Sequence, residues 1–277
     1  IYLRARPGHY GRRSVLHHRC GMGSDVYWNH LVALRSTWRP TERLTTNLTP
    51  DFSPLEQERY ARNIALRGVG EVGQRRLLES SVLVIGAGGL GSAALPYLAA
   101  AGVGRIGIVD GDVVELTNMQ RQVLHTEFGR NKAESAAQRL HELNPEVAVD
   151  IYPEMLTPDR ARKLFARYDL VLDCTDTFAA KFLISDAAED VGVPLVWATA
   201  VAWQGQCSVF GVEDEDGQRL YLRDLVPEEP PRATYKMATE VGVLGAMVGQ
   251  IGTLQATEAI KLLLGVGLPL DGRVMVL

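Results

Sequence analysis

The chain has 277 residues, of which 46% are hydrophobic, and its formal net charge is −4 at pH 7. This length suits one large domain or two small ones, and the mild negative charge argues against nucleic acid or an anionic membrane as a partner. No apolar run reaches the roughly 18 residues that a membrane-spanning helix needs. The three cysteines, Cys20, Cys174 and Cys207, are widely spaced without a C-x-x-C pair. We therefore expect neither a disulfide scaffold nor a cysteine zinc site, and we expect a cytoplasmic location.

The N-terminal part of the chain shows no regular hydrophobic period. Residues 1–53 are basic at first and then rich in Thr, Pro and Asn, and we predict that they are disordered. An amphipathic stretch follows at Pro54–Leu78. We assign residues 54–277 to one domain, and we expect this domain to be truncated because the chain stops inside an expected strand.

From residue 81 onward, short apolar runs alternate with helical patterns. The expected strands are residues 81–85, 105–109, 147–151, 170–172 and 194–198, and the expected helices are 93–101, 132–143 and one that opens at Thr157-Pro158 with Thr157 as its N-cap. We place Pro96 near the first turns of its helix or at a kink. This alternation predicts an α/β fold with a Rossmann-like, mostly parallel sheet and flanking helices.

After Gln204 the pattern changes. Residues 206–212 and 219–222 predict antiparallel strands around an acidic Asp-Gly turn, so we expect an antiparallel C-terminal extension of the sheet. The Pro- and charge-rich residues 224–238 predict a mobile loop. Residues 241–264 are mostly apolar and interrupted by glycines, and they predict a long buried core helix.

A glycine-rich turn, Gly86-Ala-Gly88-Gly89-Leu-Gly91, joins the first expected strand to the helix that follows it. Glycines permit a tight turn and a close approach of the backbone to phosphate, and the helix N-terminus adds aligned N–H groups. Asp110 ends the next strand, where a carboxylate can accept ribose hydroxyls. Together these features predict nucleotide binding, and a tight structural turn is the alternative.

Two cations favour ATP over a nicotinamide nucleotide as the ligand. Arg121 follows Asp110 within one loop, and Lys132 opens the next helix. They can hold the β- and γ-phosphates as pyrophosphate leaves, although each can also be a solvated surface charge. Asp176 follows a later strand, at the edge where open parallel sheets bind ligands. It can hold Mg²⁺ through oxygen, or cap a helix that begins at Thr177.

Several strings in this chain resemble the ThiF/MoeB/HesA family, which is related to ubiquitin-activating enzymes. They are RYAR (59–62), GEVGQRRL (70–77), VLVIGAGGLGS (82–92), AAAGVGRIGIVDGDVVELTNMQRQVLH (99–125), DLVLDCTD (169–176) and GVLGAMVGQIGTLQATEAIKLL (242–263). They occur in the family's order and cover roughly residues 55–277. The resemblance implies a homodimer that uses ATP and Mg²⁺ to adenylate the C-terminal glycine of a ubiquitin-like sulfur-carrier protein ending in Gly-Gly.

The resemblance also implies roles by position. Arg62, Arg121, Lys132 and Asp176 would be catalytic, with Arg62 reaching into the partner's active site and Asp176 holding Mg²⁺. The residues expected to contact the nucleotide are Gly86, Gly88, Gly89, Gly91, Asp110, Thr117, Asn118, Arg121, Lys132, Asp176 and Thr177. A carboxylate is already ionised at pH 7, so this reaction needs positioning and charge stabilisation rather than a general base.

The chain departs from the family at positions that bear on zinc and sulfur. Many members bind structural zinc with two C-x-x-C pairs, but Tyr221 and Asp224 stand at the first pair, so we expect no zinc. Ala238 stands where some members carry a cysteine for sulfur chemistry, so we expect a separate sulfur donor. Thr177 and Lys181 replace a common Asn and a common Arg, and both remain polar.

Four functions stay open on the sequence alone. The first is adenylation of a sulfur carrier, and the second is adenylation of a peptide or another small carboxylate. The third is an NAD-dependent oxidoreductase, against which Arg121, Lys132 and Asp176 argue together. The fourth is a non-catalytic dimeric scaffold. The sequence does not identify the carrier or its pathway.

Overall fold

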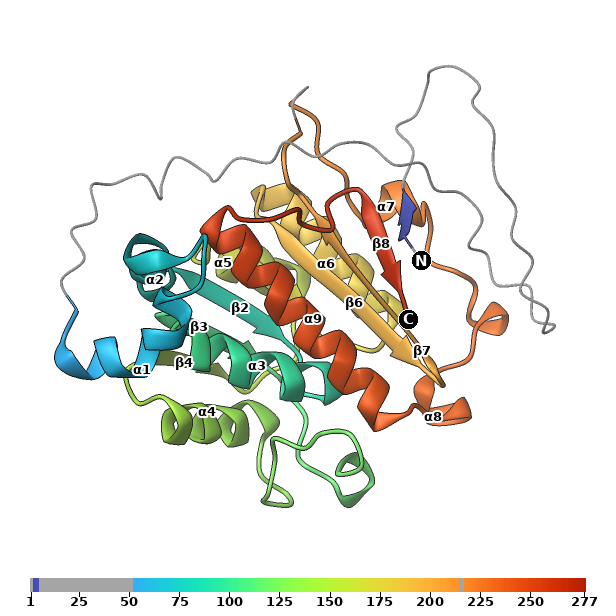
Figure 1. Ribbon diagram of the computed structural model, residues 1–277. Coiled ribbons are helices and arrows are strands. Elements are labelled where there is room, and N and C mark those ends of the chain that lie inside the picture. Colours follow the sequence, from blue (N-terminus) through green and yellow to red (C-terminus); the bar gives the residue numbers. More distant parts are fainter. Residues whose placement is uncertain (1, 5–51, 215–216) are drawn as a thin grey trace.

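The structure, a computed structural model, describes residues 2–4, 52–214 and 217–277. One eight-stranded sheet runs through the molecule in the order β1-β8-β7-β6-β5-β2-β3-β4, with helices on both of its faces (Figure 1). The predicted α/β, Rossmann-like fold class is therefore confirmed. Among the helices in the described part of the chain, none is long and apolar enough to cross a bilayer.

Five parallel strands form the Rossmann-like half of the sheet. They are β2 (Ser81–Ile85), β3 (Arg105–Val109), β4 (Ala148–Tyr152), β5 (Leu170–Asp173) and β6 (Leu195–Val201). From β2 the chain builds outward to β3 and β4, and it then crosses to β5 and β6 on the other side of β2. The carboxyl ends of β2, β3 and β5 therefore meet where the strand order reverses, which is where open α/β sheets bind ligands.

Three antiparallel strands extend the sheet beyond β6, and two of them confirm the predicted antiparallel C-terminal extension. β7 (Gln204–Phe210) pairs with β6, β8 (Arg273–Val276) pairs with β7, and β1 (Tyr2–Arg4) pairs with β8.

The expected strand at residues 219–222 is wrong. Arg219 forms only an isolated bridge with Glu213, and Leu222 begins the short helix α7 (Leu222–Leu225). β8 occupies the edge of β7 that this segment would need, because it pairs there over three residue pairs. The Asp224 carboxylate instead accepts the N–H of Tyr221 at 2.8 Å, which stabilises the start of α7.

The helices cover the two faces of the sheet in separate groups. α3 (Gly89–Ala101), α4 (Lys132–Leu143) and α9 (Gly245–Leu264) lie on one face, and α5 (Pro158–Phe165) and α6 (Phe178–Val191) lie on the other (Figure 1). Alternate side chains of a strand point to opposite faces, so β2 contributes to both cores. Burial on both faces explains why the parallel strands are continuous apolar runs rather than alternating ones.

Three helical boundaries differ from the expected ones, and glycines with positive φ account for two of them. The stretch Pro54–Leu78 divides into α1 (Pro54–Ile64) and α2 (Gly70–Glu79), because Gly68 and Gly70 have φ of +95° and +60°. α3 begins at Gly89 rather than at residue 93, so Pro96 lies inside the helix and not in its first turns.

The expected core helix at residues 241–264 also begins later than predicted. α8 (Ala238–Val241) ends at Gly242, whose φ is +79°, and α9 starts at Gly245. The preceding residues 224–238 contain the end of α7 and a 3-10 turn, η3 (Arg232–Thr234).

Of the segment 1–53, the structure describes residues 2–4, which form β1, and residues 52 and 53. Phe52 is buried, with the Arg75 guanidinium 4.5 Å from its ring centroid, and Ser53 caps α1. The other residues of this segment, and the disorder predicted for them, lie outside the described residues.

Candidate active site

The glycine-rich turn between β2 and α3 has a conformation that requires glycine. Gly86 has φ of +97°, and a Cβ there would lie 2.8 Å from the carbonyl oxygen of Cys174. A Cβ on Gly91 would lie 2.2 Å from the carbonyl oxygen of Gly86, so Gly91 closes the turn and does not line the pocket. Gly88 is the N-cap of α3 and has no side chain to cover the first N–H groups. These donors, at the positive end of the helix dipole, are available to an anion.

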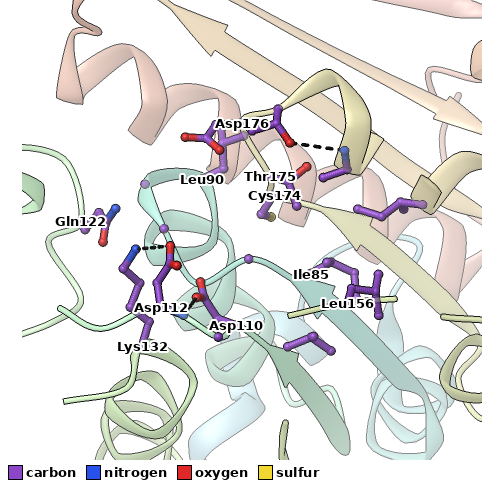
Figure 2. A pocket seen from close by; sticks show the side chains of 18 of the residues that line it. Ile85, Leu90, Asp110, Asp112, Gln122, Lys132, Leu156, Cys174, Thr175 and Asp176 are labelled. Atoms are coloured by element: carbon purple, nitrogen blue, oxygen red, sulfur yellow. Dashed lines mark hydrogen bonds and ion pairs between the residues drawn. The ribbon is translucent and has the colours of Figure 1, made fainter. Parts of the chain in front are cut away.

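A pocket of about 230 Å³ opens beside this turn, at the carboxyl ends of β2, β3 and β5. Its sides differ in chemistry: Figure 2 shows Ile85 and Leu156 on one side and Gln122 and Lys132 on the other. The predicted residues that line it are Gly86, Gly88, Gly89, Asp110, Arg121, Lys132, Asp176 and Thr177. An apolar wall beside polar and charged groups suits a ligand with a flat base and an anionic tail.

Asp110 follows β3 and holds the glycine-rich turn through hydrogen bonds. Its carboxylate accepts the N–H of Ala87 at 2.8 Å and the N–H of Asp112 at 2.9 Å. Burial raises the pKa of Asp110, although these two hydrogen bonds and the charge of Lys132 act in the opposite direction. Asp110 therefore links the turn to the loop after β3, and its predicted contact with a ribose stays a prediction.

Lys132 opens α4 and is a buried cation rather than a solvated surface charge, so the alternative interpretation of this residue is wrong. Its Nζ lies 3.0 Å from Oδ2 of Asp112, and the two side chains are 8% and 61% exposed (Figure 2). Asn131 caps α4 and donates its amide to the carbonyls of Asp110 and Asp112. Asp112, which the sequence analysis did not single out, thus holds the ammonium at the pocket.

Arg121 comes from the crossover loop after β3, which contains the 3-10 turn η2 (Leu116–Asn118). It lines the pocket and donates to the carbonyl of Thr117 at 3.3 Å. Thr117 and Asn118 themselves do not line the pocket. The Thr117 hydroxyl donates to the Glu115 carboxylate, and the Asn118 amide oxygen accepts the N–H of Glu115. Both residues shape the loop that carries Arg121.

Asp176 and Thr177 follow β5 and line the pocket. The Thr177 hydroxyl accepts the N–H of Ala180 and caps α6, so Asp176 is not the helix cap that the sequence left as its alternative role. The Asp176 side chain is exposed, and within the described residues it has no hydrogen-bond or ion-pair partner. It is therefore a carboxylate available to a cation.

Arg62 lies far from the pocket of its own chain. It is exposed on α1, and its neighbours Tyr60 and Asn63 contact Gly102 and Ala101 at the carboxyl end of α3. The pocket lies at the amino end of α3, and a helix of 13 residues is about 20 Å long. Arg62 therefore does not reach the pocket of its own chain, because its helix α1 lies near the opposite end of the sheet (Figure 1).

A family model described as ThiF family matches residues 60–277. The chain belongs to the ThiF family. It is 45% identical over 241 residues to the probable adenylyltransferase/sulfurtransferase MoeZ of Mycobacterium tuberculosis, a match that covers 84% of this chain. The chain spans 62% of the length of that relative. It is also 44% identical to a sulfur carrier protein adenylyltransferase of Thermus thermophilus, over 79% of this chain and 82% of the relative.

The ThiF-family fold is also seen in solved structures. Escherichia coli MccB superposes with a TM-score of 0.65 at 22% identity, over 79% of this chain and 66% of that protein. At this level of identity the likeness shows the fold alone.

A buried ion pair lies behind the pocket of this ThiF-family chain. Nζ of Lys181 is 3.2 Å from Oδ2 of Asp173, and it donates to the carbonyls of Thr175, at 2.8 Å, and Ala198. The side chains of Lys181 and Asp173 are 3% and 0% exposed. The resemblance marks Lys181 only as a replacement for a common arginine, but a lysine within the apolar helix α6 is itself a signal of a buried partner. The pair joins the carboxyl end of β5 to the middle of β6.

Two further residues near the ThiF-family site had no predicted role. Gln122 lines the pocket, and among the described residues its buried amide oxygen has no hydrogen-bond partner. His125 is buried, with Nε2 2.7 Å from the carbonyl oxygen of Ala87 and Nδ1 3.0 Å from Oγ of Ser135. Only their position in the string that resembles the family singles them out in the sequence.

The two cysteines that the structure describes are buried. Burial raises the pKa of both the Cys174 and the Cys207 thiol, and the Cys174 thiol donates to the amide oxygen of Gln255. The prediction that Cys207 packs in the core is confirmed. Ala238 borders the pocket, at the position where the resemblance would allow a reactive cysteine. Cys20 lies outside the described residues.

Proposed function

We propose that this chain is an ATP-dependent adenylyltransferase that activates the C-terminal glycine carboxylate of a ubiquitin-like sulfur-carrier protein ending in Gly-Gly. The adenylate would serve sulfur transfer in the biosynthesis of a cofactor or thio-metabolite. The names of the two relatives support this proposal. The observation that carries it is a pocket in which the uncapped start of α3 meets Arg121 and Lys132 beside an apolar wall. Adenylation of a peptide or another carboxylate would use the same pocket and differ only in the acceptor.

In the proposed reaction, a carboxylate oxygen of the carrier attacks the α-phosphorus of ATP. A new P–O bond forms the acyl adenylate, and the bond from the α-phosphorus to the bridging oxygen breaks, so that its electron pair leaves with pyrophosphate. The carboxylate is already ionised at neutral pH, and no general base is needed. The protein then has to align the reactants and balance the charge that moves onto pyrophosphate. Arg121 and Lys132 supply that positive charge.

The pocket also fits a magnesium ion that binds together with the nucleotide. Mg²⁺ in such sites takes one or two carboxylates, phosphate oxygens and water. Asp176 offers a carboxylate on the pocket wall, whereas Asp173 is paired with Lys181. Within the described residues no three His, Cys, Asp or Glu side chains cluster as a metal site, so phosphate and water would complete the shell. When bound, the ion would neutralise charge on the phosphates.

We propose that sulfur reaches the adenylate from a separate donor. Ala238 has no thiol to offer at the pocket. Cys174 and Cys207 are buried with raised pKa, and a thiol that stays protonated is a poor nucleophile. A structural zinc is not part of this proposal, because Tyr221 and Asp224 stand where the first ligand pair would be.

We also propose that the enzyme is a cytoplasmic homodimer in which Arg62 completes the partner's site. The support for the dimer is that Arg62 does not reach its own pocket and has no ion-pair partner among the described residues. The support for the compartment is the absence of a disulfide between Cys174 and Cys207, which are free thiols.

Calorimetric titration with ATP–Mg²⁺ and with NAD tests the nucleotide part of the proposal. We expect ATP–Mg²⁺ to bind and NAD to give no measurable heat. Lys132→Ala should weaken ATP–Mg²⁺ by roughly tenfold or more, because it removes a charge-assisted contact. Lys163→Ala, at an exposed lysine of α5, serves as the control and should bind as the wild type does. Tighter binding of NAD than of ATP would overturn the proposal in favour of an oxidoreductase.

A further inference from the structure

Both backbone groups of Ala87 are held by side chains from outside the glycine-rich turn. The Asp110 carboxylate accepts its N–H at 2.8 Å, and Nε2 of His125 lies 2.7 Å from its carbonyl oxygen. A carbonyl only accepts hydrogen bonds, so Nε2 carries the hydrogen, and Nδ1 accepts from the Ser135 hydroxyl at 3.0 Å. His125 is 1% exposed, which shields these bonds from bulk water.

The contact between His125 and Ala87 sets the direction of the next N–H group. The described chain contains no cis peptide bond, and in a planar trans peptide the C=O and N–H point in opposite directions. Because the Ala87 oxygen is turned toward His125, the N–H of Gly88 is turned away from it. Gly88 lines the pocket, and its N–H has no acceptor among the described residues.

We propose that His125 is a positioning residue, which orients the peptide between Ala87 and Gly88 so that the Gly88 N–H donates to a phosphate oxygen of the bound nucleotide. This inference rests on the proposed function, because it assumes that a nucleotide phosphate occupies the pocket. It assigns a role to a side chain that does not itself line the pocket.

His125 also connects the turn to the elements that carry the two cations. It lies in the crossover loop of Arg121, and its backbone N–H donates to the carbonyl of Gln122 at 3.3 Å. Ser135, its other partner, lies in the first turns of α4 after Lys132. The imidazole therefore fixes the position of the Gly88 N–H relative to Arg121 and Lys132. Loss of the imidazole should weaken binding of the phosphates more than binding of the nucleotide's base.

Two substitutions separate the hydrogen bond of His125 from its packing. His125→Gln keeps an N–H donor at a reach similar to that of Nε2, and His125→Leu keeps bulk without a donor. We expect His125→Leu to weaken ATP–Mg²⁺ in calorimetry by roughly tenfold or more and adenosine by less than about twofold, because adenosine brings no phosphate to Gly88. His125→Gln should bind ATP–Mg²⁺ within about threefold of the wild type. His141→Leu, at an exposed histidine of α4, is the matched control.

Hydrogen exchange of residues 86–91 without nucleotide gives a readout that does not depend on a ligand. We expect faster exchange in His125→Leu than in His125→Gln or the wild type. Equal losses of ATP and adenosine affinity in His125→Leu, or unchanged exchange, would overturn the positioning role. If the wild type does not bind ATP at all, the proposed function fails, and the exchange of residues 86–91 then decides by itself whether His125 orients the turn.

Discussion

At the scale of single residues, the buried ion pair of Lys181 and Asp173 stabilises the strands behind the pocket. The ammonium joins Asp173 on β5 to the carbonyl of Ala198 on β6, and it also holds the carbonyl of Thr175 next to Asp176. The pair is inaccessible to solvent, so removing one partner leaves the other charge uncompensated. Lys181 therefore stabilises the loop that carries Asp176.

We predict that Lys181→Met lowers the free energy of unfolding by about 3–5 kcal/mol, because the Asp173 carboxylate then stays buried without its cation. Urea unfolding followed by circular dichroism measures this loss. Lys163→Met, at an exposed lysine of α5, is the control and should change stability by less than about 0.5 kcal/mol. A loss no larger than that of the control would show that the pair contributes nothing to stability.

His125 should make stability depend on pH. Burial lowers its pKa, although its bond to Ala87 and the charge of Asp110 act in the opposite direction. Between this lowered pKa and the ordinary value near about 6.5, the unfolded chain holds a proton that the folded chain lacks. The free energy of unfolding should therefore fall as the pH drops below about 6.5, and the full contribution is present above it.

Urea unfolding of the wild type and His125→Gln between pH of about 7.5 and about 5.5 checks this dependence. The variant should lose less stability over that range, whereas His141→Gln should follow the wild type. Burial also raises the pKa of Asp110, and this raised pKa increases the free energy of unfolding as the pH drops. All the chains compared contain Asp110, so its contribution cancels in the comparison. Parallel curves for His125→Gln and the wild type would contradict the prediction.

At the scale of elements, close packing of α9 on α3 places the glycine-rich turn. A Cβ on Gly252 would lie 2.4 Å from the carbonyl oxygen of Leu90, whereas a Cβ on Gly249, in the same helix, would meet nothing within 4 Å. We predict that Gly252→Ala destabilises the protein by about 1–3 kcal/mol through overpacking. Gly249→Ala should be neutral or stabilise by up to about 1 kcal/mol. Thermal unfolding of both variants is the measurement, and the opposite order would refute this account of the packing.

The elements that the sequence predicted best are those with local signals at both ends. Strands 81–85 and 105–109 and the helix 132–143 match the structure, because each is bounded by a glycine or a cap that acts locally. The strand expected at 219–222 failed because its place at the sheet edge is decided by β8, from a distant part of the chain.

In the candidate site, too, features with local sequence signals could be predicted, and features set by tertiary contacts could not. The glycine turn, Lys132 and Asp176 could be predicted because their spacing relative to strands is visible in the sequence. The pairing of Lys132 with Asp112 and the burial of Lys181 are tertiary contacts that no local pattern reports. Thr117 is exposed and does not line the pocket, so its contact with the nucleotide stays a prediction.

At the scale of the whole molecule, the remote position of Arg62 makes a prediction about assembly. If Arg62 completes the partner's site, Arg62→Ala and Lys132→Ala chains should each be nearly inactive alone. A heterodimer of the two has one site with both defects and one with neither. Subunit exchange in an equal mixture should therefore restore about a quarter of the wild-type rate of ATP–pyrophosphate exchange. No recovery, despite heterodimers shown by native mass spectrometry, would mean that Arg62 acts in its own chain or only structurally.

We propose that this pocket transfers the adenylyl group of ATP to a carrier's C-terminal carboxylate. The most direct test is exchange of labelled pyrophosphate into ATP in the presence of a panel of ubiquitin-like proteins that end in Gly-Gly. We predict exchange with at least one of them, complete dependence on its terminal glycine, and a rate lowered roughly 100-fold or more by Asp176→Ala. ATP binding without exchange for any carrier, or exchange that persists when the terminal glycine is removed, would contradict the claim.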